Sequence, residues 1–296
     1  MPSAELQGIV AALRSNPSGA DFSLAQLRQQ LEERAKAAPL APDIRCKPVQ
    51  ADGVPCEWVL APDADQRAIV LYLHGGGYYR GSLNTHRELC SRISRAAGMA
   101  VLHVGYRLAP EHPFPAALED ALAAWRWLAE MGVPHDRIVA AGDSAGGGLA
   151  AAMLLVLRDR EAALPGAGVL LSPWTDLEQT GPSMRTRQAA DPSLTKAYLD
   201  RFAAAYLNGA PVTDPRASPY YGDLSGLPPL LIQVGSAEIL EDDAARFARK
   251  VKAAGGQATL ELWPDMFHVW HRYAARLPEA QAAIDKIGAF IKKTLA

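Results

Sequence analysis

Several features are scarce in this sequence of 296 residues, and each scarcity argues against a class of protein. There are three cysteines, Cys46, Cys56 and Cys90, and their spacing matches no metal-binding C-x-x-C pair. An odd and small number of cysteines favours reduced thiols in a cytoplasmic protein, although a single bridge between Cys46 and Cys56 stays open. We therefore expect neither a metal site nor a disulfide-stabilised fold.

An excess of charge and long apolar runs are also missing. Lys and Arg number 30 against 32 Asp and Glu, without a dense basic run, so nucleic acid and anionic membranes are not expected partners. The uncharged stretch from Ala145 to Leu157 spans 13 residues, fewer than the roughly 18 of a membrane-spanning helix. The N-terminus shows no basic segment followed by an apolar core, so we expect neither a cleaved secretory signal nor stable membrane insertion.

Short apolar runs that end in Gly or Pro alternate with helical stretches along most of the chain. The runs lie at 68–73, 100–104, 138–141, 169–171, 230–234 and 259–263, and the helical stretches at 85–97, 115–130, 145–160, 242–254 and 278–295. This alternation predicts a single α/β domain over residues 1–296, with a mostly parallel sheet covered by helices on both faces. Ligands of such sheets bind beyond the carboxyl ends of the strands.

Two regions fall outside this alternation. Residues 1 to about 45 show apolar positions at helical spacing, interrupted by a turn at Asn16-Pro-Ser-Gly, and residues 178–215 hold a further helix around 195–207. We expect these regions to form a cap over a catalytic core of about 46–177 and 216–296. An additional packing helix without a gating role is the alternative.

The pentapeptide Gly142-Asp-Ser-Ala-Gly146 follows an apolar run and opens a small-residue helix. This strand, turn and helix context is what the G-x-S-x-G nucleophile elbow requires, with Ser144 exposed at the turn. The glycines leave room for the tight backbone. Ser144 is therefore the candidate nucleophile, although such a pentapeptide can arise by chance in a chain rich in Gly and Ala.

The sequence His74-Gly-Gly-Gly77 comes directly after another apolar run. Three glycines allow backbone N–H groups to converge on one point, which predicts an oxyanion hole in this loop, completed by the N–H of Ala145. A phosphate-binding loop is the alternative, but no Gly-Lys-Ser/Thr ending follows.

Seven histidines compete for the role of the general base. In the order nucleophile, acid, base, the base must come well after Ser144, which leaves His268, in the loop after the last strand, and His271. For the acid, Glu238 follows the strand at 230–234, whereas Asp242 fits the first turn of the next helix. We predict His268 as base and Glu238 as acid, with Asp242 ranked second.

Taken together, these blocks resemble the hormone-sensitive lipase family of α/β-hydrolases, in the bacterial esterase branch called family IV. The matching segments are His74 to Ser82, Tyr106 to Asp120 and Gly142 to Gly147, in the family's order. The resemblance implies an α/β-hydrolase fold, Ser144 as nucleophile, His268 as base, and Gly76, Gly77 and Ala145 as oxyanion donors, with Gly75 a less certain fourth. Many members carry Asp-Pro-Leu where this chain has Glu238-Ile-Leu.

The expected function is hydrolysis of short to medium carboxylic esters through an acyl-enzyme, without a cofactor. Lactones, N-acetyl compounds and aryl amides are alternative substrates, and a non-catalytic binding module on the same scaffold is the alternative of another class. The resemblance also implies a homodimer, paired near the C-terminal strand. Four aromatic residues are candidates for either a substrate pocket or ordinary core packing: Tyr78, Trp174, Phe202 and Tyr206.

Overall fold

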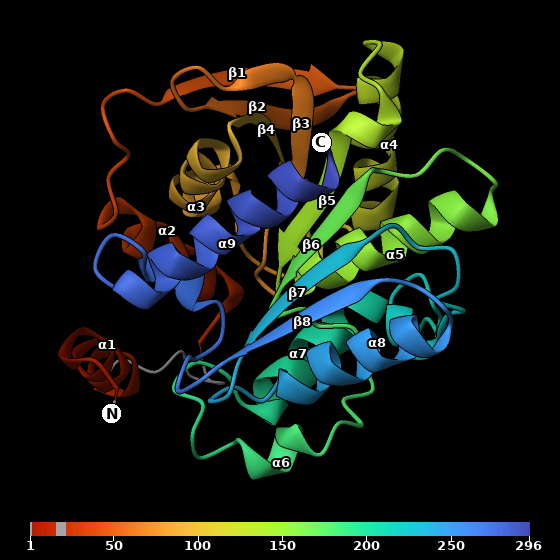
Figure 1. Cartoon of the computed structure of the whole chain (residues 1–296). Helices are drawn as coiled ribbons and strands as arrows, with labels where there is room; N and C mark the ends of the chain where they lie inside the picture. The colour runs from red at the N-terminus through yellow and green to blue at the C-terminus, as the bar shows by residue number, and fades with distance from the viewer. Residues whose placement is uncertain (1, 16–21) are drawn as a thin grey trace.

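The computed structural model describes residues 2–15 and 22–296. Its centre is an eight-stranded sheet in the order β1-β2-β4-β3-β5-β6-β7-β8 (Figure 1). β2 pairs antiparallel with β1 and with β4, and from β4 to β8 all neighbouring strands run parallel. The strands are β1 (Arg45–Ala51), β2 (Val54–Leu60), β3 (Asp65–Leu73), β4 (Met99–Val104), β5 (Ile138–Asp143), β6 (Ala167–Leu171), β7 (Leu230–Gly235) and β8 (Ala258–Trp263).

Helices cover both faces of the sheet (Figure 1). On one face, α3 (Leu83–Ala97) and α9 (Pro278–Thr294) pack against each other and the strands. On the other lie α4 (Ala116–Glu130), α5 (Ala145–Asp159) and α8 (Glu241–Ala253). Because both faces are covered, the strands β4, β5, β6 and β7 are buried along their whole length, which explains their continuous apolar sequence.

The predicted α/β class and the six predicted strands are confirmed. The hairpin of β1 and β2 was not predicted, since Pro48 and Pro55 interrupt its sequence and Ala51 is the one buried residue of β1. Proline removes a ladder donor and is normally confined to edge strands. β1 is such an edge strand, which explains how it tolerates Pro48.

In their described residues, the predicted cap regions contain four helices: α1 (Ala4–Ser15), α2 (Leu24–Lys36), α6 (Ser183–Thr186) and α7 (Lys196–Leu207). In Figure 1, α1, α6 and α7 lie toward the lower part of the view. Leu13 of α1, Leu31 of α2 and Phe202 of α7 border the same cavity as Ser144. The turn predicted at Asn16 lies outside the described residues.

The three cysteines are free thiols. Cys46 faces Val59 across the hairpin and Cys56 faces Val49, so the two are out of register for a bridge. Three short 3-10 helices complete the described structure: η1 (His135–Arg137), η2 (Pro219–Tyr221) and η3 (Trp270–Tyr273).

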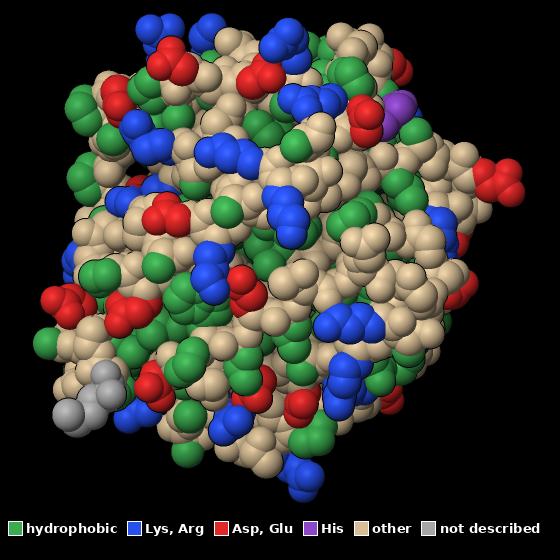
Figure 2. Space-filling view, in the orientation of Figure 1, with side chains coloured by type: hydrophobic (Ala, Val, Ile, Leu, Met, Phe, Trp, Pro, Cys, Tyr) green, Lys and Arg blue, Asp and Glu red, His purple; other side chains and the backbone are tan. Residues whose placement is uncertain are grey.

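The face drawn in Figure 2 carries Lys and Arg side chains interspersed with Asp and Glu, so it presents no broad surface of one sign. None of the helices in the described part of the chain combines the length and the apolarity needed to cross a membrane.

Candidate active site

Ser144 sits at the sharp turn between β5 and α5. Its backbone has φ 54° and ψ −123°, a conformation that is strained for any residue with a Cβ. The turn is held because the Ser144 N–H donates to the Leu171 carbonyl at 2.8 Å. A Cβ on Gly142 would lie 2.4 Å from the Gly146 carbonyl oxygen, and one on Gly146 would lie 2.0 Å from that of Leu73. The elbow therefore needs both glycines.

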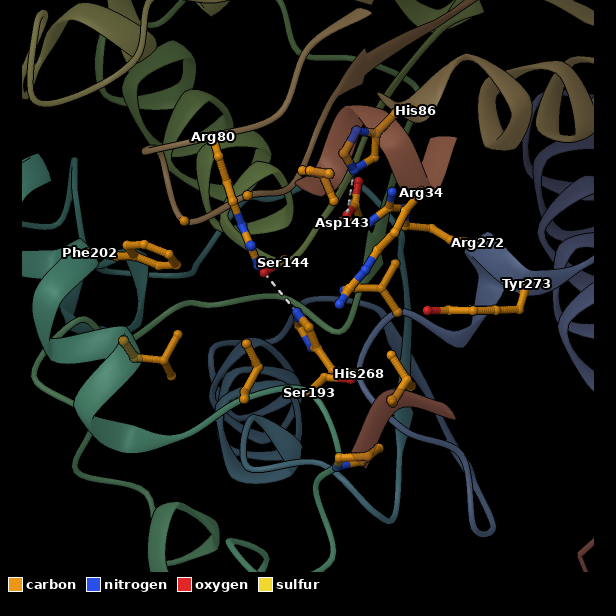
Figure 3. Close-up of a pocket in the computed structure, with 18 residues that line it drawn as sticks. Arg34, Arg80, His86, Asp143, Ser144, Ser193, Phe202, His268, Arg272 and Tyr273 are labelled. Atoms are coloured by element: carbon orange, nitrogen blue, oxygen red, sulfur yellow. Dashed lines mark hydrogen bonds and ion pairs between the residues drawn. The ribbon is translucent and has the colours of Figure 1, made fainter. Parts of the chain in front are cut away.

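His268 lies in the loop after β8 and faces Ser144 (Figure 3). Its Nε2 is 2.9 Å from Ser144 Oγ, and its Nδ1 is 2.7 Å from Oε2 of Glu238. The next residue, Val269, has φ 50°, a left-handed turn that is rare for a β-branched side chain. The structure thus brings the predicted nucleophile, base and acid into one hydrogen-bonded chain.

Glu238 is fully buried at the end of β7. Its second oxygen, Oε1, accepts hydrogen bonds from the Gly235 N–H and from the hydroxyl of Ser172, both at 2.7 Å. Ser172 in turn accepts the N–H of Val269 at 3.2 Å. These contacts fix the carboxylate and tie the acid loop to the base loop. Ser172 was not predicted, although its place directly after β6 is a strand-end position like the others.

The residues ranked second at the sequence level lie elsewhere. Asp242 is in the first turn of α8, where Oδ2 accepts the N–H of Ser183 at 2.6 Å. His271 is in η3 with Nε2 2.8 Å from Oε1 of Gln233, and burial lowers the pKa of His271 to about 3. A histidine that stays neutral in contact with a core amide has a packing role.

Gly76 and Gly77 form the loop beside Ser144, with φ values of 130° and 68°. A Cβ on Gly76 would lie 2.0 Å from the carbonyl oxygen of Arg80, so only glycine fits there. Within the described residues, the backbone N–H groups of Gly76, Gly77 and Ala145 have no protein acceptor. The N–H of Gly75 differs because it donates to Asp143 at 3.0 Å, which removes Gly75 as the suggested fourth donor.

Asp143, the residue before the nucleophile, anchors this loop to the elbow. Besides the Gly75 N–H, its carboxylate accepts the hydroxyl of Tyr72 at 2.7 Å and lies 3.3 Å from Nε2 of His86. Burial alone raises the pKa of Asp143, but His86 and the Tyr72 hydrogen bond lower it by more, so this pKa is held well below its usual range. Sequence reasoning passed over Asp143 because it is only the variable position of the motif.

Asp143→Asn is expected to destabilise the protein by about 2 kcal/mol or more at pH 7, because the amide has no charge and places a donor at the Oδ2 position that faces Nε2 of His86. A lowered native pKa gives stability above the usual value of 3.8 that is lost as the pH falls below it. The difference from the wild type should therefore shrink below about pH 4. Thermal unfolding midpoints between pH 7 and 3 measure this effect.

Asp52→Asn is the matched control, because Asp52 forms an exposed ion pair with Arg126. We expect a change of about 0.5 kcal/mol or less for this variant. A loss in Asp143→Asn that stayed constant from pH 7 to 3 would contradict the assignment of the charge to Asp143.

The cavity at Ser144 has a volume of about 90 Å³. Of the four aromatic pocket candidates, Phe202 lines it, and a Cβ on Gly77 would meet that ring at 2.3 Å. Tyr78, Trp174 and Tyr206 are instead buried behind the wall, where the rings of Tyr78 and Tyr206 stack with centroids 3.8 Å apart. For these three residues the observed burial and ring stacking match core packing, the other interpretation that the sequence left open.

Chemically, this arrangement suits nucleophilic attack by a serine hydroxyl. His268 is placed to take the proton of Ser144, and Glu238 is placed to hold the imidazole in the tautomer that accepts it. The N–H groups of Gly76, Gly77 and Ala145, which have no protein acceptor among the described residues, are available to a developing negative charge on oxygen. In the described part of the chain, no group of three or more His, Cys, Asp or Glu side chains has the arrangement of a metal site.

Comparisons with known proteins agree with this fold. A family model described as "alpha/beta hydrolase fold" matches residues 70 to 272. An acetyl-hydrolase from Streptomyces hygroscopicus is 52% identical over 80% of this chain and 79% of its own length. An esterase from Acinetobacter venetianus is 35% identical over 96% of this chain and 94% of its own. The crystal structure of an esterase from the bacterial hormone-sensitive lipase family superposes over both full chains with a TM-score of 0.97 and 47% identity.

Proposed function

The chain belongs to the bacterial hormone-sensitive lipase family of α/β-hydrolases, and from this membership we propose that it is a serine carboxylesterase. The observation that carries the proposal is the hydrogen-bonded chain from Ser144 through His268 to Glu238, beside backbone N–H groups without a protein acceptor in the described residues. The esterase names of its relatives support the same reaction class.

In the first half of the reaction, Ser144 Oγ attacks the ester carbonyl carbon while His268 Nε2 takes the hydroxyl proton. The carbonyl electron pair moves onto oxygen, where the N–H groups of Gly76, Gly77 and Ala145 stabilise it. The carbon–oxygen bond to the alcohol then breaks, and His268 returns its proton to the departing alkoxide. The acyl group remains as an ester of Ser144.

In the second half, water takes the place of the alcohol. His268 removes a proton from the water as its oxygen attacks the acyl carbon, and the same oxyanion donors stabilise the second tetrahedral intermediate. Breaking the bond to Ser144 Oγ releases the carboxylic acid, and His268 reprotonates the serine. Glu238 holds His268 in position and stabilises the imidazolium in both halves.

Short acyl groups fit this site better than long ones. The cavity has a volume of only about 90 Å³ and is lined in part by Phe202, and the acetyl-hydrolase name of the Streptomyces relative points to a small acyl group. Lactones, N-acetyl compounds and aryl amides remain alternative substrates of the same machinery.

A series of p-nitrophenyl esters from acetate to decanoate tests the proposal. We expect kcat/KM to be highest for acetate to butyrate and to fall about tenfold or more by decanoate, because longer chains cannot be enclosed. Phe202→Leu should shift the preference toward longer chains. Absence of turnover with every ester would contradict the esterase proposal, and a preference for decanoate would contradict the acyl-length proposal.

Three further expectations remain proposals. We propose that residues 1 to about 45 and 178–215 act as the cap of the site, because side chains from both regions border the cavity. Two chains are proposed to pair through β8, an edge strand whose Leu262 is half exposed. A cytoplasmic location is proposed on the free thiols of the three cysteines.

A further inference from the structure

Three arginines line the cavity that opens onto Ser144. Arg80 comes from the loop after the oxyanion glycines, Arg34 from α2 and Arg272 from η3. Figure 3 shows Arg80 extending toward Ser144, with Arg34 and Arg272 reaching the same cavity from other directions. Among the described residues of the cavity wall, the one carboxylate is that of Asp143.

Asp143 supplies a single negative charge against the positive charges of the three arginines. Its oxygens are occupied by the Tyr72 hydroxyl, the Gly75 N–H and His86, as described above. No carboxylate is among the main groups that shift the pKa of Arg80. Burial lowers the pKa of Arg80, and Arg34 and Arg272 lower it further, while Tyr198 raises it. The cavity therefore has a positive field that its own acid does not cancel.

The guanidinium of Arg80 is also incompletely hydrogen bonded. Its Nε and Nη1 atoms are buried and have no hydrogen-bond acceptor among the described residues. The group lies over the rings of Tyr198 and Phe202, with its central carbon 5.2 and 5.7 Å from the two centroids. Aromatic faces attract and position a cation, but they leave the in-plane N–H groups available for an acceptor. A buried cation with donors of this kind is unfavourable until an anion binds it.

We propose that the natural substrate is an ester that carries a carboxylate, in its acid part or its alcohol part, and that Arg80 binds this carboxylate. The planar guanidinium fork matches the two oxygens of a carboxylate, and Arg34 and Arg272 add to the attraction. Hydrolysis then releases either a dicarboxylic acid or a hydroxy acid. This inference rests on the esterase function proposed above and names the substrate class of the same site.

Two pairs of esters test the proposal on the wild type. The first compares p-nitrophenyl hemiglutarate with p-nitrophenyl hexanoate, which places the charge in the acid part. The second compares para-acetoxybenzoate with its methyl ester, which places the charge in the alcohol part. We expect kcat/KM to favour the anionic member of one pair by about tenfold or more.

Arg80 variants then assign the preference. Arg80→Met keeps an apolar stem over Tyr198 and Phe202 but has no charge, and it should reduce the ratio of anionic to neutral kcat/KM by about 10-fold to 100-fold. Arg80→Lys keeps the charge and should retain part of that ratio. Arg126→Met is the control, because it removes one exposed positive charge on α4, away from the cavity, and should leave the ratio unchanged.

A ratio near one in both pairs, or an undiminished ratio in Arg80→Met, would overturn the proposal. If Arg80→Met does not fold, inhibition of the wild type by glutarate and by glutaramide decides instead. About tenfold stronger inhibition by glutarate is expected, and equal inhibition would overturn the proposal. Turnover of neutral esters without a preference defeats only this inference, whereas no turnover of any ester defeats the esterase function as well.

Discussion

Replacing Ser144 by alanine is expected to lower kcat toward p-nitrophenyl acetate by a factor on the order of 10⁴ or more. In the proposed mechanism this variant loses the atom that forms the acyl-enzyme, so His268 has no nucleophile to deprotonate 2.9 Å away. The proposed oxyanion donors remain, and we expect them to give a residual rate above the uncatalysed reaction. Initial rates at saturating ester, corrected for spontaneous hydrolysis, measure the loss.

The thermal stability of Ser144→Ala serves as a control for its fold. Alanine keeps a Cβ at the strained φ of 54°, so the fold and the thermal unfolding midpoint should change little. Phenylmethylsulfonyl fluoride gives an independent readout, since intact mass should show one covalent adduct on the wild type and none on Ser144→Ala. Turnover within about tenfold of the wild type would contradict the assignment of Ser144, because triad nucleophiles contribute far more.

The parts of this site that could be predicted from sequence are those fixed by strand ends. Ser144, Glu238 and His268 each follow an apolar strand, and parallel strands bring such positions to one edge of the sheet. The glycines of the site could also be predicted, because a local backbone conformation such as the φ of 68° at Gly77 favours glycine. The central strands could be predicted from their sequence, because burial on both faces of the sheet requires a continuous run of apolar residues.

Other features depend on which side chains meet in space, and no local pattern encodes that. Tyr78 and Tyr206 stack on each other 128 positions apart (206 − 78), yet in sequence each resembles Phe202, which lines the cavity. Ser172 follows β6 and donates a hydrogen bond to Glu238, which follows the neighbouring strand β7. In the sequence Arg80 looks like a surface arginine, because the rings beneath its guanidinium belong to α7, more than 100 residues further along the chain. These contacts could be identified only from the tertiary structure.

Glu238→Gln is expected to lower kcat by about 10³-fold to 10⁴-fold. The amide oxygen can keep the hydrogen bonds from Ser172 and the Gly235 N–H, so the amide nitrogen must face Nδ1 of His268. A donor at that position forces Nδ1 to accept and places the imidazole proton on Nε2. Nε2 then donates to Ser144 and cannot take its proton, so the base is held in the wrong tautomer. Steady-state kinetics with p-nitrophenyl acetate measure the loss.

Asp242→Asn is the matched control, because it changes the other carboxylate that sequence ranked for the same role. Asp242 contacts the N–H of Ser183 and not His268, so kcat should stay within about threefold of the wild type, as for a change outside the reacting groups. Glu238→Asp keeps the charge with a shorter reach, and its loss should be smaller than that of Glu238→Gln. If Asp242→Asn were inactive and Glu238→Gln active, the acid would be Asp242. The control thus separates the role of the buried carboxylate from that of any nearby negative charge.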